Sequence, residues 1–161
     1  VAAVGGIHPA LGPASLAVPD QIIDYTWGRE HTFSAEGHVL HADCTEPYDR
    51  NLRAALIRGA AAAGVEVLPQ GVYAVTQGPR LETAAEVRKL QAEGCDMVGM
   101  TAMPEAALAR ELDLAYATLA VSVNWAAGLG PAGSDIHGDI ADSLERGMVK
   151  VRAVLGAVLG E

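Results

Sequence analysis

The stretch from Gln77 to Ala109 most constrains the fold of this chain, because several element boundaries fall within it. Its Gly78-Pro79 pair excludes both a helix interior and a central strand at that point. A helix with Val87 and Leu90 on its apolar face is predicted next. Gly94 is expected to end this helix at the C′ position, where glycine adopts the left-handed conformation. The first half of the stretch therefore predicts a turn followed by a short helix.

The second half of the stretch predicts a buried strand and the start of another helix. Met97 to Met100 is short and apolar, which is typical of a strand that is covered on both faces. Pro104 stands where the first turn of a helix accommodates proline. This order places Glu82, Met100 and Thr101 at the ends of elements, and α/β proteins gather their ligands at such ends.

The rest of the chain continues the alternation of strands and helices. Strands are predicted at 1–4, 15–18, 21–25, within 65–75 and at 116–123, and helices at 48–63 and from 135 onward. The polar segment 27–43 has no clear period and is expected to be a long loop. No repeat, linker or low-complexity tract divides the sequence, so one domain over residues 1–161 is expected. The alternation predicts an α/β sandwich around a largely parallel or mixed sheet.

Composition excludes several classes of partner. The net charge of −9 argues against nucleic acid or an anionic membrane, since both favour clustered Lys and Arg. The longest apolar runs are too short to span a bilayer, and no leader for export is seen. Cys44 and Cys95 are not in a metal-binding or redox spacing. We therefore expect two free thiols in a protein of the reducing cytoplasm.

The start of the chain predicts a strand that lacks an initiator Met. Val1 to Val4 is apolar, and Gly5-Gly6 lets the backbone pass close to a ligand or a neighbouring element. A buried strand is an unusual place for a protein to begin. We therefore expect that a segment upstream is missing.

Several segments together resemble one family. They are Ala3 to Gly6, Asp20 to Asp24, Gly78 to Thr83 (GPRLET), Gly94 to Glu105 (GCDMVGMTAMPE) and Val123-Asn124. In this order and at this spacing they resemble the trimeric purine nucleoside phosphorylases, which include the methylthioadenosine phosphorylases. Within that family they are most similar to the bacterial S-methyl-5′-thioinosine phosphorylase branch.

The resemblance implies a three-layer α/β sandwich around a mixed β-sheet, a homotrimer, and cleavage of a purine nucleoside by inorganic phosphate as co-substrate, without another cofactor. It also implies that this chain is the C-terminal two-thirds of such an enzyme. The first third of the family carries a Gly-rich phosphate loop, an Arg-His pair that binds phosphate and the first strands of the sheet.

Asn124 and Glu82 are the residues that the resemblance places at the purine base. Asn124 matches the position that stabilises the departing base, and its amide can donate to N7 and O6. Glu82 matches the acidic residue that accepts a hydrogen bond from N1–H of a 6-oxopurine, a proton that adenine lacks. From the residues alone, Asn124 can instead cap the turn after its strand, and Glu82 can be a charge at a helix N-terminus.

Further positions follow from the same resemblance. Leu81 covers the purine face, where many relatives carry Phe, and Val123 lies beside Asn124 in the base pocket. The Ala3 backbone, Met100 and Thr101 contact ribose and phosphate. Without the family, Met100 is an ordinary core residue and Thr101 an N-cap.

The group at the 5′ position is expected to meet His41, His137 and Ile140. His41 matches a His that methylthioadenosine phosphorylases lend from the neighbouring subunit. Ile140 stands where ordinary nucleoside phosphorylases carry a His for the 5′-hydroxyl, and an apolar residue there suits a methylthio group. Ile140 can equally face the core from an amphipathic helix.

Only one cluster, His38, His41, Asp43 and Cys44, has the composition of a metal site. Its spacing fits no standard zinc pattern, so we expect no metal.

The leading hypothesis is phosphorolysis of S-methyl-5′-thioinosine to hypoxanthine and 5-methylthioribose 1-phosphate, in purine salvage. The alternatives are an inosine or guanosine phosphorylase and a non-catalytic fragment that retains purine binding or trimer contacts.

Overall fold

The described strands form one mixed sheet. The computed structural model describes residues 1–34, 39–131 and 136–160, without the side chains of 136–139. Seven strands in this part of the chain follow the order β3-β5-β6-β1-β7-β2-β4. Their bounds are β1 Ala2–Gly6, β2 Leu16–Ala17, β3 Gln21–Asp24, β4 Val67–Leu68, β5 Val72–Val75, β6 Met97–Gly99 and β7 Ala120–Trp125. The β1–β6 and β2–β7 pairs are antiparallel and the other pairs are parallel.

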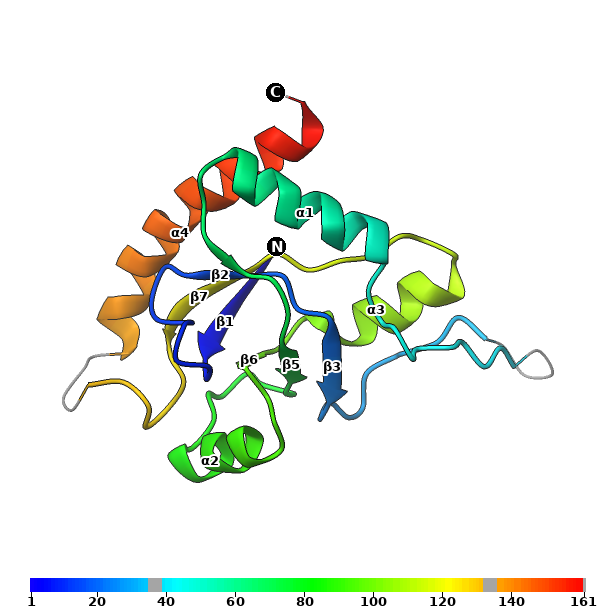
Figure 1. The fold of residues 1–161 in the computed structure, drawn as a ribbon. Helices are drawn as coiled ribbons and strands as arrows, with labels where there is room; N and C mark the ends of the chain where they lie inside the picture. The colour runs from blue at the N-terminus through cyan, green and yellow to red at the C-terminus, as the bar shows by residue number, and fades with distance from the viewer. Residues whose placement is uncertain (35–38, 132–135, 161) are drawn as a thin grey trace.

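Helices cover both faces of this sheet. Their bounds are α1 Arg50–Ala62, α2 Ala84–Ala92, α3 Ala102–Glu111 and α4 Ile136–Leu159. Figure 1 shows α1 and α4 together above the sheet and α2 below it. The upper core joins Leu56 of α1 and Val154 of α4 to Val121 of β7, and the lower core joins Val87 of α2 to Val98 of β6. The predicted three-layer sandwich around a mixed sheet is confirmed.

Local sequence explains where α1 begins and how it packs on α4. Asp49 caps α1 by accepting a 2.7 Å hydrogen bond from Leu52 N, so one of the free N–H groups at the helix start is satisfied. Gly59 permits the close contact of α1 with α4, since a Cβ there would lie 2.5 Å from a methyl group of Val158. The two long helices therefore form one packed layer.

The last strand begins later than its apolar sequence predicts. A strand was expected over 116–123, whereas β7 starts at Ala120. Asp49 N donates to Tyr116 O over 2.7 Å, and the Tyr48 ring stacks on the Tyr116 ring with 5.9 Å between centroids. These contacts tie the segment before β7 to the start of α1 instead of to another strand.

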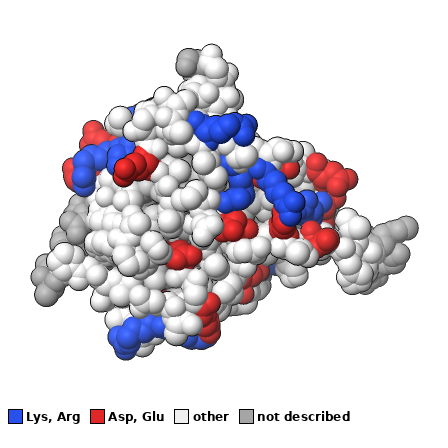
Figure 2. All heavy atoms as spheres, in the orientation of Figure 1, with Lys and Arg blue, Asp and Glu red and all other residues white. Residues whose placement is uncertain are grey.

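Figure 2 shows that uncharged side chains form most of this face and that basic groups lie beside acidic ones. Cys44 is exposed, Cys95 is buried, and both are free thiols, as predicted. Among the described helices, none has the length and apolar character that crossing a membrane requires.

Candidate functional site

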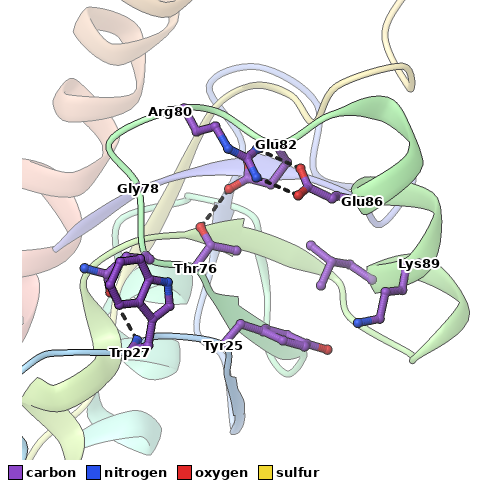
Figure 3. A pocket seen from close by; sticks show the side chains of 10 residues that line it. Tyr25, Trp27, Thr76, Gly78, Arg80, Glu82, Glu86 and Lys89 are labelled. Carbon is purple, nitrogen blue, oxygen red and sulfur yellow. Dashed lines mark hydrogen bonds and ion pairs between the residues drawn. The ribbon is translucent and has the colours of Figure 1, made fainter.

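A pocket of about 310 Å³ opens where the end of β3, the loop after β5 and the first turns of α2 meet (Figure 3). It contains Glu82, one of the residues that the sequence assigned to base recognition. Its lining consists of Tyr25, Trp27, Thr76, Gln77, Gly78, Arg80, Glu82, Glu86, Lys89 and Leu90. Aromatic rings from the β3 side thus face charged side chains from the α2 side across this pocket.

Glu82 does not cap α2. Thr83 is the N-cap, and its Oγ1 accepts from Glu86 N while the Glu86 carboxylate accepts from Thr83 N over 2.7 Å. Arg80 binds the same carboxylate through two hydrogen bonds, and with the Thr83 N–H it lowers the pKa of Glu86 to about 2. Because Glu86 satisfies the helix start, the alternative role of Glu82 as a capping charge is taken by another residue.

Glu82 is instead held by the end of β5. Its Oε1 accepts a 2.7 Å hydrogen bond from Thr76 Oγ1, which Figure 3 shows inside the pocket. Thr76 N in turn donates to Gly99 O at the end of β6 over 2.8 Å. The carboxylate is therefore positioned by two neighbouring parallel strands, with one oxygen directed by a hydroxyl donor.

Met100 lies at the same edge of the sheet as Glu82. A Cβ on Gly78, which has φ +64°, would lie 2.4 Å from Met100 Sδ. Glycine therefore serves two purposes in the GPRLET turn, since it permits the left-handed conformation and admits the thioether. The structure thus places Met100 against the GPRLET turn, which also carries Glu82.

Thr101 and Ala3 both present surface to solvent. Thr101 is the N-cap of α3 but makes no side-chain capping bond, and its Oγ1 lies 3.4 Å from the hydroxyl of buried Tyr73. The hydroxyl thus lacks the capping bond that its alternative role requires. Ala3 is exposed on β1 and pairs with Val121 of β7.

Asn124 lies on β7, one strand beyond β1. Its Cα pairs with Gly5, and Gly5 pairs with Val98 of β6 on its other side. The Asn124 Nδ2 donates to Trp125 O over 2.6 Å, a local bond of the kind that the turn-capping alternative describes. The loop after β7 reaches the start of α2, where Gly128 closely approaches Ala84. The chain therefore runs from Asn124 to the first turn of α2, the helix that follows Glu82 in the sequence.

Among the described residues that the sequence assigned to the site, Glu82 alone lines this pocket. Several of the others lie in different parts of the molecule. His41 lines a separate cavity of about 570 Å³ together with Glu46 and Arg110. Ile140 packs against the core under α1 and α4, and Val123 is buried in that core. Leu81 is 44% exposed within the GPRLET turn, and the side chain of His137 lies outside the described residues.

No metal centre is found in the described part of the chain, where no three His, Cys, Asp or Glu side chains are placed to hold an ion. His38, a member of the cluster considered from sequence, lies outside that part.

This chain matches the model of a known protein family. Residues 1–160 match the family model described as the Phosphorylase superfamily. The chain belongs to this superfamily. The resemblance on which the sequence analysis relied is thereby confirmed.

Relatives of this superfamily member are longer than the chain itself. A probable S-methyl-5′-thioinosine phosphorylase of Pseudomonas syringae pv. tomato is 53% identical over 161 residues, which are 99% of this chain and 65% of that protein. A 6-oxopurine nucleoside phosphorylase of Pyrococcus furiosus is 42% identical over 89% of this chain and 57% of its own length. The chain thus spans less than two thirds of either relative.

Solved structures give the same result for the fold. Methylthioadenosine phosphorylase from Schistosoma mansoni in complex with adenine superposes with a TM-score of 0.91 at 28% identity. The superposition covers 99% of this chain and 63% of the other.

Two polar residues of this candidate site were not predicted from the sequence. Thr76 binds Glu82, and Arg29 donates to groups at the ends of β5 and β6. Thr76 directly follows a predicted strand, which was a usable signal. Arg29 belongs to the segment without a period, and no local pattern distinguished it there.

Proposed function

We propose that this chain carries the base and ribose half of a purine nucleoside phosphorylase that acts on S-methyl-5′-thioinosine. The products are hypoxanthine and 5-methylthioribose 1-phosphate, and the reaction serves purine salvage. The observation that carries the proposal is the Glu82 carboxylate, which is freed from helix capping and directed into the pocket by Thr76. Two of the relatives are named for 6-oxopurine or thioinosine nucleosides, which supports the same substrate class.

Base recognition follows from the donors and acceptors of two side chains. Cleavage of the glycosidic bond leaves negative charge on the purine, and fixed donors lower the energy of that state. Asn124 donates its amide N–H to N7 or O6 after releasing Trp125 O. Glu82 accepts the N1–H of hypoxanthine. Adenine has no N1–H, so binding it would leave the other carboxylate oxygen of Glu82 without a donor from the base.

The sugar and phosphate are assigned to the neighbouring strand ends. Met100 lies beneath the ribose, and the Thr101 hydroxyl and Ala3 N–H contact phosphate. Leu81 covers the purine face. Val123, whose side chain is buried in the core, supports the base pocket through the backbone that carries Asn124. These roles are consistent with the exposure of Thr101 and Ala3.

A second candidate is an inosine or guanosine phosphorylase. The packing of Ile140 against the core favours it, because the apolar 5′ pocket was inferred from that residue. His41 and His137 remain assigned to the 5′ group in either case. We further propose a cytoplasmic homotrimer, in which His41 serves a neighbouring subunit, since it lies outside the Glu82 pocket of its own chain.

Release of free base with and without phosphate tests the proposal. The substrates are S-methyl-5′-thioinosine, methylthioadenosine, inosine and guanosine, and calorimetry with hypoxanthine and adenine runs in parallel. Phosphate-dependent release that favours methylthioinosine supports the main proposal, and preference for inosine or guanosine supports the second. Hypoxanthine binding without release identifies a purine-binding fragment. A folded chain that does not prefer hypoxanthine to adenine would contradict all three.

A further inference from the structure

Arg29 uses all of its hydrogen-bond donors at the edge of the candidate site. Its Nε donates to Gln77 Oε1 (3.0 Å), and its Nη2 donates to Thr76 O (3.2 Å) and Gln77 O (3.0 Å). Its Nη1 donates to Met100 O (2.8 Å) and to Met103 O. An arginine side chain has five N–H donors in a fixed fork, so every donor has an acceptor here.

These acceptors belong to the segments that carry the proposed site residues. Thr76 and Gln77 follow β5, Met100 follows β6, and Met103 lies at the kink in α3. Segments that directly follow parallel strands have carbonyl groups without a partner in the sheet, and a planar cation can bind several of these groups together. One side chain therefore fixes the relative positions of three segments.

Charge distinguishes this contact from an ordinary ion pair. Among the described residues, no carboxylate lies within ion-pair distance of Arg29, although Arg50, Arg80 and Arg146 each pair with one. Arg29 is also half-buried, whereas the side chains of those three are largely exposed. The guanidinium is thus committed to backbone carbonyls instead of to a neighbouring acid.

We propose that Arg29 is a positioning residue, which sets the base specificity of the site by holding the Thr76–Glu82 hydrogen bond and the Met100 backbone in place. The inference rests on the proposed function. Arg29 lies in the loop that follows β3, and Trp27 N of the same loop donates to Gln77 Oε1 over 3.2 Å. The loop is therefore bound both to Thr76, which orients Glu82, and to its neighbour Gln77.

The test compares two arginines that bind carbonyl groups. Arg53 of α1 donates to Val18 O, Pro19 O and Pro69 O, at the β2 and β4 side of the sheet. We expect R29A to weaken hypoxanthine binding about tenfold, because a half-buried hydrogen-bond network loses its donor. Its preference for hypoxanthine over adenine should fall by a similar factor. R53A should leave the hypoxanthine affinity and the base preference unchanged, even if its midpoint of urea unfolding falls as much as that of R29A.

Two further variants separate positioning from loss of folding. R29K keeps the charge but not the planar fork, and we expect a folded protein with an intermediate preference for hypoxanthine. T76V keeps the carbonyl that Arg29 binds but removes the donor to Glu82, so it should lower the preference as R29A does. The double variant R29A/T76V should then lower it no further, since both changes act on one interaction.

Each outcome decides between the proposals. If the unaltered chain does not prefer hypoxanthine, the proposed function fails, and the role of Arg29 fails with it. If the unaltered chain prefers hypoxanthine but folded R29A or R29K retains its full preference, the role of Arg29 alone is wrong. Additive losses in R29A/T76V would likewise overturn the path through Glu82.

Discussion

Thr76 Oγ1 donates a 2.7 Å hydrogen bond to Glu82 Oε1, and this bond joins the end of β5 to the loop that begins α2. The neighbouring Thr83 and Glu86 form the capping box of α2 between themselves. Two adjacent acid–threonine pairs thus have different tasks, because one satisfies the helix start and the other orients a carboxylate in the pocket. The substrate assignment depends on this division.

Removal of the Glu82 carboxylate should reduce binding of 6-oxopurines specifically. E82A leaves the N1–H of hypoxanthine without an acceptor, which costs about 1–3 kcal/mol, or roughly fivefold to 150-fold in affinity. Adenine affinity should hardly change, since adenine has no N1–H. Calorimetry with both bases measures the effect. E66A removes an exposed carboxylate on the segment before β4 and serves as the charge control. Equal losses for both bases would refute the role of Glu82.

Substitution of Asn124 by Asp should shift the preference toward adenine. The carboxylate accepts a hydrogen bond from the 6-amino group, whereas it repels O6 and N7 of hypoxanthine. We expect the ratio of hypoxanthine to adenine affinity to fall by about tenfold or more, because an amide donor is replaced by a charged group that only accepts. N51D, on the exposed side of α1, makes the same chemical change outside the site. If N124D and N51D have the same ratio, Asn124 is only a residue of its turn.

The sequence predicted most elements because their signals are local. Apolar runs indicated the strands, and Gly94 and Pro104 marked boundaries that the structure contains close to the predicted places. Strand order has no local signal, since β1 lies between β6 and β7, which come much later in the chain. The predicted start of β7 was wrong for a related reason, because Tyr116 is bound by Asp49 at the start of α1 and not by another strand.

The candidate site was predicted through a motif, and its supporting contacts were not. GPRLET identified Glu82, and the capping alternative for this residue was resolved only by the contacts of Glu86. Arg29 is separated from Met100 by most of the central chain, so the bond between them depends on tertiary packing. Residues that touch the ligand recur in recognisable motifs, whereas residues that orient them are found by their contacts.

Two N-cap threonines should respond differently to loss of the hydroxyl. Thr83 accepts from Glu86 N, so T83A should destabilise the fold by about 1 kcal/mol. Thr101 makes no capping bond, so T101A should cost less stability. If Thr101 contacts phosphate, T101A should instead raise the phosphate concentration that half-maximal base release requires. Urea unfolding and phosphate titration of both variants measure the two effects. A larger stability loss in T101A would show that its hydroxyl caps α3 after all.

The pH dependence of stability should report the Arg80–Glu86 pair. Arg80 is the main cause that lowers the pKa of Glu86 from its ordinary 4.5 to about 2. A carboxyl with a lower pKa in the folded state contributes stability above its unfolded pKa and loses it as pH falls through the folded one. The stability of the fold should therefore decrease as pH falls from 4.5 to about 2. The stability of E86Q should change less with pH over that window. Urea midpoints from pH 2 to about 6 measure both curves.

E66Q is the control for this comparison, because it changes the same charge at an exposed site. Its curve should run parallel to that of the unaltered chain, while the E86Q curve converges with it toward low pH. The side chains of Arg80 and Glu86 are both exposed, so added salt should reduce the difference in stability between E86Q and the unaltered chain. Parallel curves for all three proteins would mean that Arg80 does not stabilise the charged form of Glu86 in solution. The start of α2 would then depend on the Thr83 cap alone.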